Sequence, residues 1–431
     1  MGLLESRPFR ELISELYGEG EDTLKRQVSR YRSLIDTFQT SFGKGDVHLF
    51  STPGRTEIAG NHTDHNGGLV LAGSVHLDTI AVARRTDSQV ISVFSEGFPA
   101  PFEANIANIE ARAEERETTT ALIRGIAARV RELGYKAGGF NAVISSNVGI
   151  GSGLSSSASI EVLLATIVNC FYNGGEIPML ELAKIGQYAE NNYFMKPCGL
   201  MDQIACGFGG IVAIDFADSR NPVVHAVDFN LTDFGYNLLV VSTGSDHADL
   251  TEDYAAIPED MRSAAAVFDK HVCRELSLAD IMDNVPLLRR EAGDRSLLRA
   301  YHFLTENERV RGQVAALQNG DMRLFLSLVQ NSGNSSALWL QNSFSTRHPV
   351  NQPVTVTLAL TEHFFRNREG GAFRVHGGGF AGTIQVFIPE QYCDEYIEHM
   401  ESRMGRGSVT VLCIRSYGSI HINELVQGDS S

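Results

Sequence analysis

The clearest chemical signal in this chain is a glycine- and serine-rich run that extends from 149 to 159. Its glycines at 149, 151 and 153 let the backbone turn N–H groups inward, and serines at 155–157 can cap the helix expected over Ile160–Cys170. The positive end of that helix would face an anion in the loop. Just upstream, Phe140–Ile144 alternates apolar with small or polar residues, as a strand does. The run predicts a phosphate-binding loop, although any glycine-rich turn before a helix has a similar composition.

A second cluster of polar side chains occupies the segment 53–68. Two apolar strand candidates, Leu69–Ala72 and Thr79–Ala83, follow it and indicate that it is attached to a sheet. By composition alone such a segment would be a solvated turn whose side chains bond their own backbone. Arg55 could bind an anion, and a polyol ligand would suit the donors and acceptors of Asn61, His62, Asp64 and Asn66.

The third candidate is Asp202, which lies in the segment Cys198–Gln203 after a helix expected from Met179 to Asn192. Apolar neighbours at 200, 201 and 204 would desolvate its carboxylate unless a cation pairs with it. A carboxylate that faces a cation and a hydroxyl is a general-base candidate, although a lone aspartate in such a place is more often a turn or cap residue.

The length of the chain predicts two domains. At 431 residues it exceeds the size at which single cores stop growing, and we expect domains at 1–215 and 216–431. The boundary follows the strand-like stretch Gly210–Ile214, beyond which a turn-rich segment begins. Helices are expected to prevail from Arg262 to Arg366.

Composition restricts the class of partner and the compartment. The net charge of −16 disfavours nucleic-acid binding, and there is no run of about 18 apolar residues that could span a membrane. The N-terminus lacks an apolar signal core, and the six cysteines lie far apart without a CxxC pair. These features predict reduced thiols in a cytoplasmic protein. They leave the oligomeric state open, with a monomer as one option.

In their order along the chain, the three segments resemble the galactokinase branch of the GHMP kinases, a superfamily of small-molecule kinases. The segment 53–68 is similar to the family's galactokinase motif, 149–159 to its GLSSSAS loop and 198–203 to its CGxMDQ segment; a glycine-rich run at 374–383 takes the place of a fourth motif. The resemblance implies an α+β, two-lobed GHMP kinase fold. Its N-terminal lobe has a mixed sheet (ribosomal protein S5 domain 2-like), its C-terminal lobe is α/β, and the active site lies between them.

The resemblance also implies an activity. The protein would transfer a phosphoryl group from ATP to the anomeric C1 hydroxyl of galactose, giving galactose 1-phosphate and ADP. Asp202 would take the hydroxyl proton, and Arg55 would orient that carboxylate. Ser157 and Glu190 would hold Mg²⁺. The ATP phosphates would lie against Gly149, Gly151, Ser152, Gly153, Leu154, Ser155, Ser156, Ser157 and Ala158.

By the same resemblance the sugar would contact Arg55, Asn61, His62, Asp64, Gly199, Asp202 and Tyr254. Asn61 departs from the family, which usually has a glutamate there. Asparagine can bind a hydroxyl but also tolerates a carboxylate that glutamate would repel. Two alternatives therefore stay open: a 1-kinase for a related sugar such as galacturonate or arabinose, and a non-catalytic sensor that binds sugar and ATP.

Overall fold

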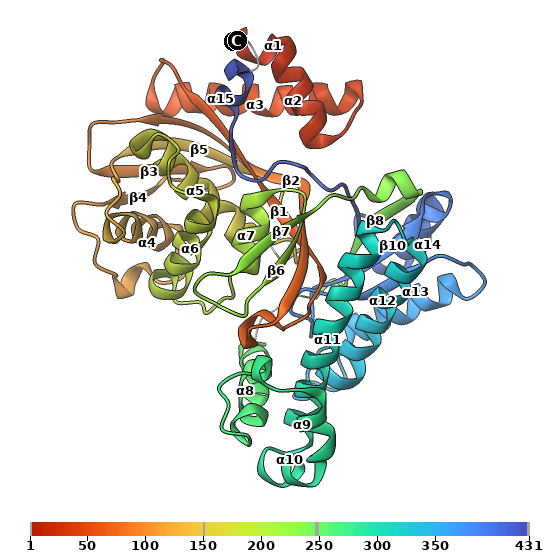
Figure 1. Cartoon of the computed structure of the whole chain (residues 1–431). Helices are drawn as coiled ribbons and strands as arrows, with labels where there is room; N and C mark the ends of the chain where they lie inside the picture. The colour runs from red at the N-terminus through yellow and green to blue at the C-terminus, as the bar shows by residue number, and fades with distance from the viewer. Residues whose placement is uncertain (1, 150, 246–249, 429–431) are drawn as a thin grey trace.

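The computed structural model describes residues 2–149, 151–245 and 250–428. It contains two β-sheets, one of eight strands and one of four, each covered by helices (Figure 1). We call the larger sheet with its helices the first lobe, and the smaller sheet together with α8–α14 the second lobe. The predicted α+β fold class is confirmed.

The larger sheet is mixed and has the strand order β12-β1-β2-β5-β3-β4, with β6 paired to β2 and β7 to β6. β3 and β5 run parallel, and the other pairs are antiparallel. The predicted strand at Phe140–Ile144 is β5, and the two predicted at Leu69–Ala72 and Thr79–Ala83 are parts of one long strand, β2. The strands span β1 His48–Ala59, β2 Leu69–Arg85, β3 Val90–Ser95, β4 Phe102–Asn105, β5 Phe140–Ser146, β6 Ile211–Asp215, β7 Val223–Val227 and β12 Ile420–His421.

Alternate side chains of this sheet enter two different cores, because successive residues of a strand point to opposite faces. Phe50 and Ala81 pack against α4, α5 and α6, whereas Leu49 and Ile80 pack against α2, α3 and α15. Figure 1 shows the N-terminal helices beside α15 at the top of the molecule. The helices of this lobe are α1 Gly2–Glu5, α2 Arg7–Tyr17, α3 Glu21–Phe42, α4 Thr119–Glu132, α5 Ser156–Asn173, α6 Met179–Ala189, α7 Met201–Phe208 and α15 Ile422–Gly428.

The smaller sheet is antiparallel, in the order β11-β8-β10-β9. Its two faces also divide: Val241 and Val386 pack against α13 and α14, and Leu238 and Phe387 against α11 and α12. As predicted, helices prevail between 262 and 366. The elements are β8 Tyr236–Ser242, β9 Ala372–His376, β10 Thr383–Pro389, β11 Val409–Leu412, α8 Thr251–Ala266, α9 Leu278–Asp283, α10 Val285–Glu291, α11 Asp294–Gln318, α12 Met322–Ser335, α13 Pro353–Phe365 and α14 Cys393–Met404.

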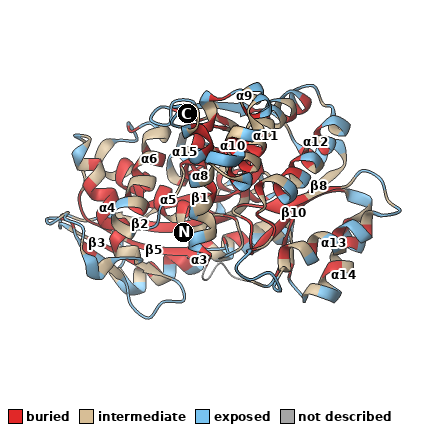
Figure 2. Cartoon of the chain, turned by 90° about the horizontal axis from the view of Figure 1, so that it is seen from below, coloured by how far each residue is buried: buried red, intermediate tan, exposed pale blue. Residues whose placement is uncertain are grey.

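The two lobes share a core. Ile58 of β1 and Leu71 of β2 belong to the same buried cluster as Leu238 of β8, and Figure 2 shows buried residues running through both lobes. The predicted boundary after Asp215 stays a prediction, because β7 and β12, which lie beyond it in the chain, pair within the larger sheet.

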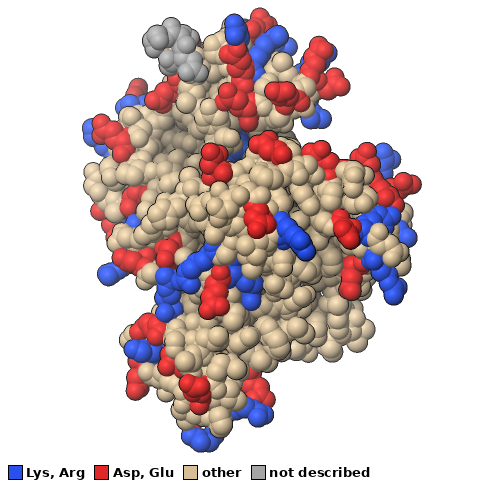
Figure 3. All heavy atoms as spheres, turned by 45° about the vertical axis from the view of Figure 1, so that its right-hand side comes forward, with Lys and Arg blue, Asp and Glu red and all other residues tan. Residues whose placement is uncertain are grey.

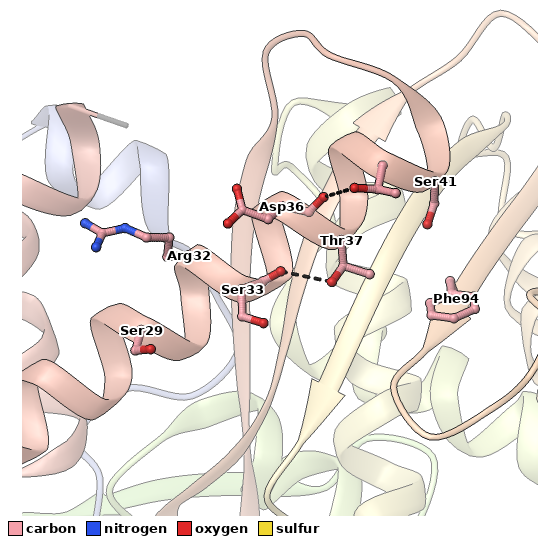
Figure 4. Close-up of a pocket in the computed structure, with 8 residues that line it drawn as sticks. Ser29, Arg32, Ser33, Asp36, Thr37, Ser41 and Phe94 are labelled. Carbon is pink, nitrogen blue, oxygen red and sulfur yellow. Dashed lines mark hydrogen bonds between the residues drawn. The ribbon is translucent and has the colours of Figure 1, made fainter.

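The surface adds two observations. Acidic and basic side chains are interspersed on the face shown in Figure 3. A hollow beside α3 is lined by Ser33, Thr37 and Phe94 among others (Figure 4). The hydroxyl groups of its two threonines bond within the helix: Thr37 Oγ1 donates to the Ser33 carbonyl at 3.0 Å and Thr40 Oγ1 to the Asp36 carbonyl at 2.8 Å. Within the described ranges we find no helix long and apolar enough to cross a membrane.

Candidate active site

A cavity of about 720 Å³, here called the large cavity, lies where the two lobes meet. The glycine-serine loop and the segment 196–199 line it from the first lobe. α8 and the residues 376–378 line it from the second. Its volume is in the range of sites that enclose a cofactor-sized ligand.

A smaller cavity of about 130 Å³ adjoins the large one, and both are lined by Arg55 and Asp202. Polar and charged side chains dominate its wall. The residues that line this small cavity are Arg55, Glu57, His62, Asp64, His65, Cys198, Gly199, Met201, Asp202, Gly377 and Gly378. The predicted phosphate loop borders the large cavity and the predicted polyol-binding residues His62 and Asp64 line the small one. Asp202 lies where the two cavities adjoin.

Asp202 is held in a fixed orientation at the start of α7. Arg55 donates to it in a bidentate pair, from Nε to Oδ1 at 2.7 Å and from Nη2 to Oδ2 at 2.8 Å. The Ser155 hydroxyl also donates to Oδ2. Burial would raise the pKa of Asp202, but the charge and hydrogen bonds of Arg55, with Ser155 assisting, hold that pKa below its usual value. The carboxylate is ionised at neutral pH and faces the cavity, with about a third (32%) of its side chain exposed.

The glycine-serine loop leaves a helix end open toward the large cavity. Ser155 has a left-handed conformation (φ 59°), and its side chain makes no capping bond to α5. The predicted serine cap is wrong at this position, because the hydroxyl is drawn to Asp202 instead. With no side-chain cap, the first N–H groups of α5 stay available to an anion, and they carry the positive end of the helix dipole.

Glycine is required at one position of the loop in particular. Gly153 has φ +73°, and a Cβ there would lie 2.6 Å from Thr383 Oγ1 and 2.9 Å from His376 Nδ1. The Gly153 carbonyl also accepts from Arg55. The loop thus packs closely on the second lobe while it holds the arginine of the Arg55–Asp202 pair.

Most of the predicted phosphate-contacting residues line the large cavity, and three do not. Gly149, Gly151, Gly153, Ser155, Ser156 and Ser157 line it. Leu154 and Ala158 are buried in the protein, and Ser152 bonds back to the Gly149 carbonyl. Ile150 falls outside the described residues.

Five of the predicted sugar-contacting residues line the small cavity: Arg55, His62, Asp64, Gly199 and Asp202. His62 donates from Nε2 to the Gly378 carbonyl at 2.8 Å, and burial lowers the pKa of this histidine to about 3, so the ring is neutral. Asp64 lies so close to Gly199 that a Cβ on the glycine would collide with its carboxylate. Tyr254, the predicted contact on α8, lines the large cavity and donates to the Gly379 carbonyl at 2.8 Å.

Asn61 does not line either cavity, and its role as a direct sugar contact stays a prediction. Its side chain is fully buried. The amide nitrogen donates to Glu57 Oε1 at 2.9 Å and to the Gly377 carbonyl at 2.6 Å. The amide oxygen accepts from Asn342 at 2.7 Å and from Ser336 at 3.3 Å. Through these four hydrogen bonds Asn61 connects β1 of the first lobe to the second lobe.

Glu190, a predicted metal ligand, begins a π-helical turn and lies in a buried cluster with Glu161 and Gln203. The amide of Gln203 donates to both carboxylates, at 2.9 Å to Glu161 and 3.2 Å to Glu190. One oxygen of each of the three side chains is buried without a hydrogen-bond partner. Burial and the charge of Glu190 raise the pKa of Glu161 well above its usual value. Such a set of unpartnered oxygens suits a hard cation.

Sequence reasoning missed several residues of the site. Glu57 lines the small cavity, and Lys196 and Arg262 bring positive charge to the large one. Lys196 lies 3.6 Å from Glu190. Glu57 stands two positions after Arg55, so the two side chains share a face of β1. This strand was not predicted from the sequence, and Glu57 was missed with it.

Comparisons with known proteins agree with this geometry. Residues 121–210 match the GHMP kinases N terminal domain, and residues 36–85 match the galactokinase galactose-binding signature. Galactokinase from Streptomyces coelicolor is 30% identical over 370 residues, which cover 85% of this chain and 91% of the relative. The chain belongs to the galactokinase family. Galactokinase from Lactococcus lactis is also 30% identical, over 366 residues that cover 83% of this chain and 87% of that protein.

Solved structures share the fold. The crystal structure of Lactococcus lactis galactokinase complexed with galactose aligns with a TM-score of 0.78 at 25% identity, covering 91% of this chain and 99% of that one. A crystal structure of mevalonate kinase aligns with a TM-score of 0.58 at 16% identity, covering 85% of this chain and 98% of that one, and so shares the fold alone. The protein is thus a sugar kinase by family and a GHMP kinase by fold.

Proposed function

We propose that this protein transfers the γ-phosphoryl group of ATP to the anomeric C1 hydroxyl of galactose and releases galactose 1-phosphate and ADP. One observation carries the proposal: the Arg55–Asp202 pair lies where a cavity bordered by a phosphate loop meets a cavity lined by polar side chains. The comparisons support galactose as the acceptor, since the two relatives named above are galactokinases and the Lactococcus lactis galactokinase was solved with galactose.

Asp202 would orient the C1 hydroxyl and accept its proton. Because its pKa is held low, the carboxylate is ionised at neutral pH but is a weak base. Proton transfer to it becomes favourable once the hydroxyl oxygen has begun to bond to phosphorus and has become more acidic. The carboxylate therefore acts first by position and later as the proton acceptor.

The remaining catalytic contribution is electrostatic. Arg55 would keep Asp202 ionised and place a positive charge between the two cavities, where the transferred group passes. The open N-terminus of α5 and the Lys196 ammonium would hold the phosphates from the other side. Phosphoryl transfer is catalysed mainly by such positioning and charge, with little covalent work for the protein.

The donor set also fits the magnesium ion that ATP-dependent transfer uses. Ser157 lines the large cavity, and Glu190 presents a buried oxygen without a hydrogen bond, so these two would hold the ion as predicted. Glu161 and Gln203 would support Glu190 from behind. Bound Mg²⁺ would neutralise charge on the phosphate oxygens.

We further propose a cytoplasmic location, on the ground that all six cysteines are unpaired thiols. Fractionation of the source cells with an antibody to the protein would test it, and recovery outside the cytosol would contradict it.

The activity is tested by magnesium-dependent release of ADP from ATP with a panel of galactose, galacturonate, arabinose, N-acetylgalactosamine, glucose and mevalonate. We expect turnover of galactose and none in the Asp202→Asn variant. Turnover of another sugar in preference to galactose would reassign the substrate. Binding of sugar and ATP without turnover of any acceptor would instead support the sensor.

A further inference from the structure

We propose that Glu57, and not Asn61, presents the carboxylate that reads an outer hydroxyl of the sugar, and that it selects a neutral hexose over the corresponding uronic acid. The inference rests on the proposed function, because it names the substrate class of the same site. It also answers the question that the asparagine at position 61 raised, since a carboxylate is still present at this end of the site.

The strand geometry directs Glu57 into the small cavity. Residues 55 and 57 lie in the regularly paired part of β1, between two irregularities of its register with β2. Side chains two apart on a strand share a face. Glu57 accordingly lines the same cavity as Arg55, with its side chain 4% exposed.

One oxygen of the Glu57 carboxylate is engaged, and the other is available. Oε1 accepts from Arg374 Nη2 at 2.5 Å and from Asn61 Nδ2 at 2.9 Å. Among the described residues, none donates a hydrogen bond to Oε2. Burial raises the pKa of Glu57, while the charges of Arg374 and Arg55 oppose that rise and favour the ionised form. An oxygen with free lone pairs in a cavity wall is an acceptor for a ligand hydroxyl.

Asn61 completes this arrangement because its amide is neutral. It donates to Glu57 and so fixes the orientation of the carboxylate. A glutamate at 61 would bring a second carboxylate within hydrogen-bonding distance of the first, in a buried place. A neutral residue at 61 is therefore required for a carboxylate at 57, and with this pair the sugar end of the site holds a single carboxylate from these two positions.

The charge of the cavity wall then decides between a hydroxymethyl group and a carboxylate on the sugar. Three carboxylates, those of Glu57, Asp64 and Asp202, line this wall with one arginine, Arg55, and Arg374 pairs with Glu57 from outside the lining. A uronate would add a negative charge beside Glu57, whereas a hydroxyl would donate to it. Like-charge contacts of this kind are a strong basis for rejection.

The test compares kcat/KM for galactose and for galacturonate in the wild-type protein and in Glu57→Gln. In the variant we expect kcat/KM for galactose to fall about tenfold, as for the loss of one charge-assisted hydrogen bond. The ratio of galactose to galacturonate should fall by more than tenfold, because the repulsion of the uronate is also removed. A series of monodeoxygalactoses identifies the hydroxyl that Glu57 binds. Removal of that hydroxyl should lower kcat/KM strongly in the wild-type protein and only slightly further in Glu57→Gln, which has already lost the hydrogen bond.

Glu306→Gln is the matched control. Glu306 is a buried glutamate at the same junction of the lobes, where it accepts from the Gly60 N–H at 3.1 Å and from Arg309 at 2.7 Å, but it lines neither cavity. Its substitution should lower stability and leave the sugar ratio unchanged. A purely structural role for Glu57 predicts the same behaviour for both variants.

The outcomes separate the two proposals. If the wild-type protein phosphorylates galactose and Glu57→Gln leaves the sugar ratio unchanged, the role of Glu57 is overturned and the proposed function stands. If the wild-type protein phosphorylates none of the panel, the proposed function itself fails. Should Glu57→Gln not fold, calorimetric binding to the wild-type protein decides: we expect galactose to bind at least tenfold more tightly than galacturonate, and equal binding would overturn the inference.

Discussion

The two sides of this active site are built in different ways. The phosphate side comes from one continuous segment, in which glycines and an uncapped helix end present backbone groups to the cavity. The sugar side is assembled from both lobes: Glu57 meets Arg374, 317 positions away, and Asn61 meets Asn342, 281 positions away. Backbone N–H groups can bind any phosphate, whereas side chains held across an interface can discriminate between sugars. The site thus combines a locally encoded general part with a specific part that depends on the assembled fold.

Asp202 connects the two sides, so its substitution has the largest expected effect. In Asp202→Asn, turnover of galactose should fall at least a thousandfold, about 4 kcal/mol in the activation barrier. Affinity for ATP should change little, because the loop and the end of α5 are intact. Steady-state kinetics and nucleotide titration measure the two quantities. A variant that keeps a tenth of the wild-type kcat would show that Asp202 is not the proton acceptor.

Acid should weaken the contact between the lobes, because three neutral histidines, His62, His302 and His376, lie there. Burial lowers the pKa of His62 to about 3 and that of His302 to about 4, and also lowers the pKa of His376. An unfolded histidine binds a proton below about pH 6.5. The free energy of unfolding should therefore fall as the pH drops from 6.5 toward 4, by about 1.4 kcal/mol per histidine and pH unit.

Urea unfolding at pH 7 and pH 5 measures this loss. His302→Asn should remove about a third of the pH dependence that the three histidines cause. Equal stability at the two pH values, or an unchanged dependence in the variant, would contradict the assignment of neutral rings to this contact.

Asn61→Glu tests whether the sugar side holds a single carboxylate. We expect the free energy of unfolding to fall by about 3 kcal/mol, because the new charge is buried beside Glu57 and the amide bonds to Asn342 and Ser336 are lost. The double variant Glu57→Gln/Asn61→Glu has one carboxylate again and should recover most of the loss. Additive effects in this double-mutant cycle would mean that the two side chains do not interact.

Lys196 gives the smallest expected effect and concerns the phosphate side alone. Its side chain is 63% exposed, so the solvent screens its charge. Lys196→Ala should raise KM for ATP about threefold to tenfold and leave KM for galactose unchanged, with a difference that shrinks as salt is added. Lys184→Ala, a substitution outside both cavities, is the control. A larger change in KM for galactose than in KM for ATP would show that Lys196 acts on the sugar side instead.

The same contrast explains what the sequence could predict. The phosphate loop, its flanking strand and helix, and the motif around Asp202 were predictable because their signals are local. The serine cap was predicted wrongly because Ser155 bonds to Asp202, 47 positions away. Asn61 was assigned to the sugar because it takes the position of the family's glutamate, and nothing in the sequence indicated its contacts with Glu57, Gly377 and Asn342 at the junction of the lobes. Contacts of such long range are set by the fold and have no signature in a single segment.

The position of the phosphate on the product tests the proposed activity more directly than any substitution. Wild-type protein is incubated with ATP, magnesium and galactose, and the product is analysed by phosphorus-coupled proton NMR. We expect the anomeric proton to couple to phosphorus, as it must when the phosphate is on the C1 oxygen. Coupling of phosphorus to the protons at C6 or any other carbon, or unchanged galactose beside intact ATP, would contradict the proposed activity.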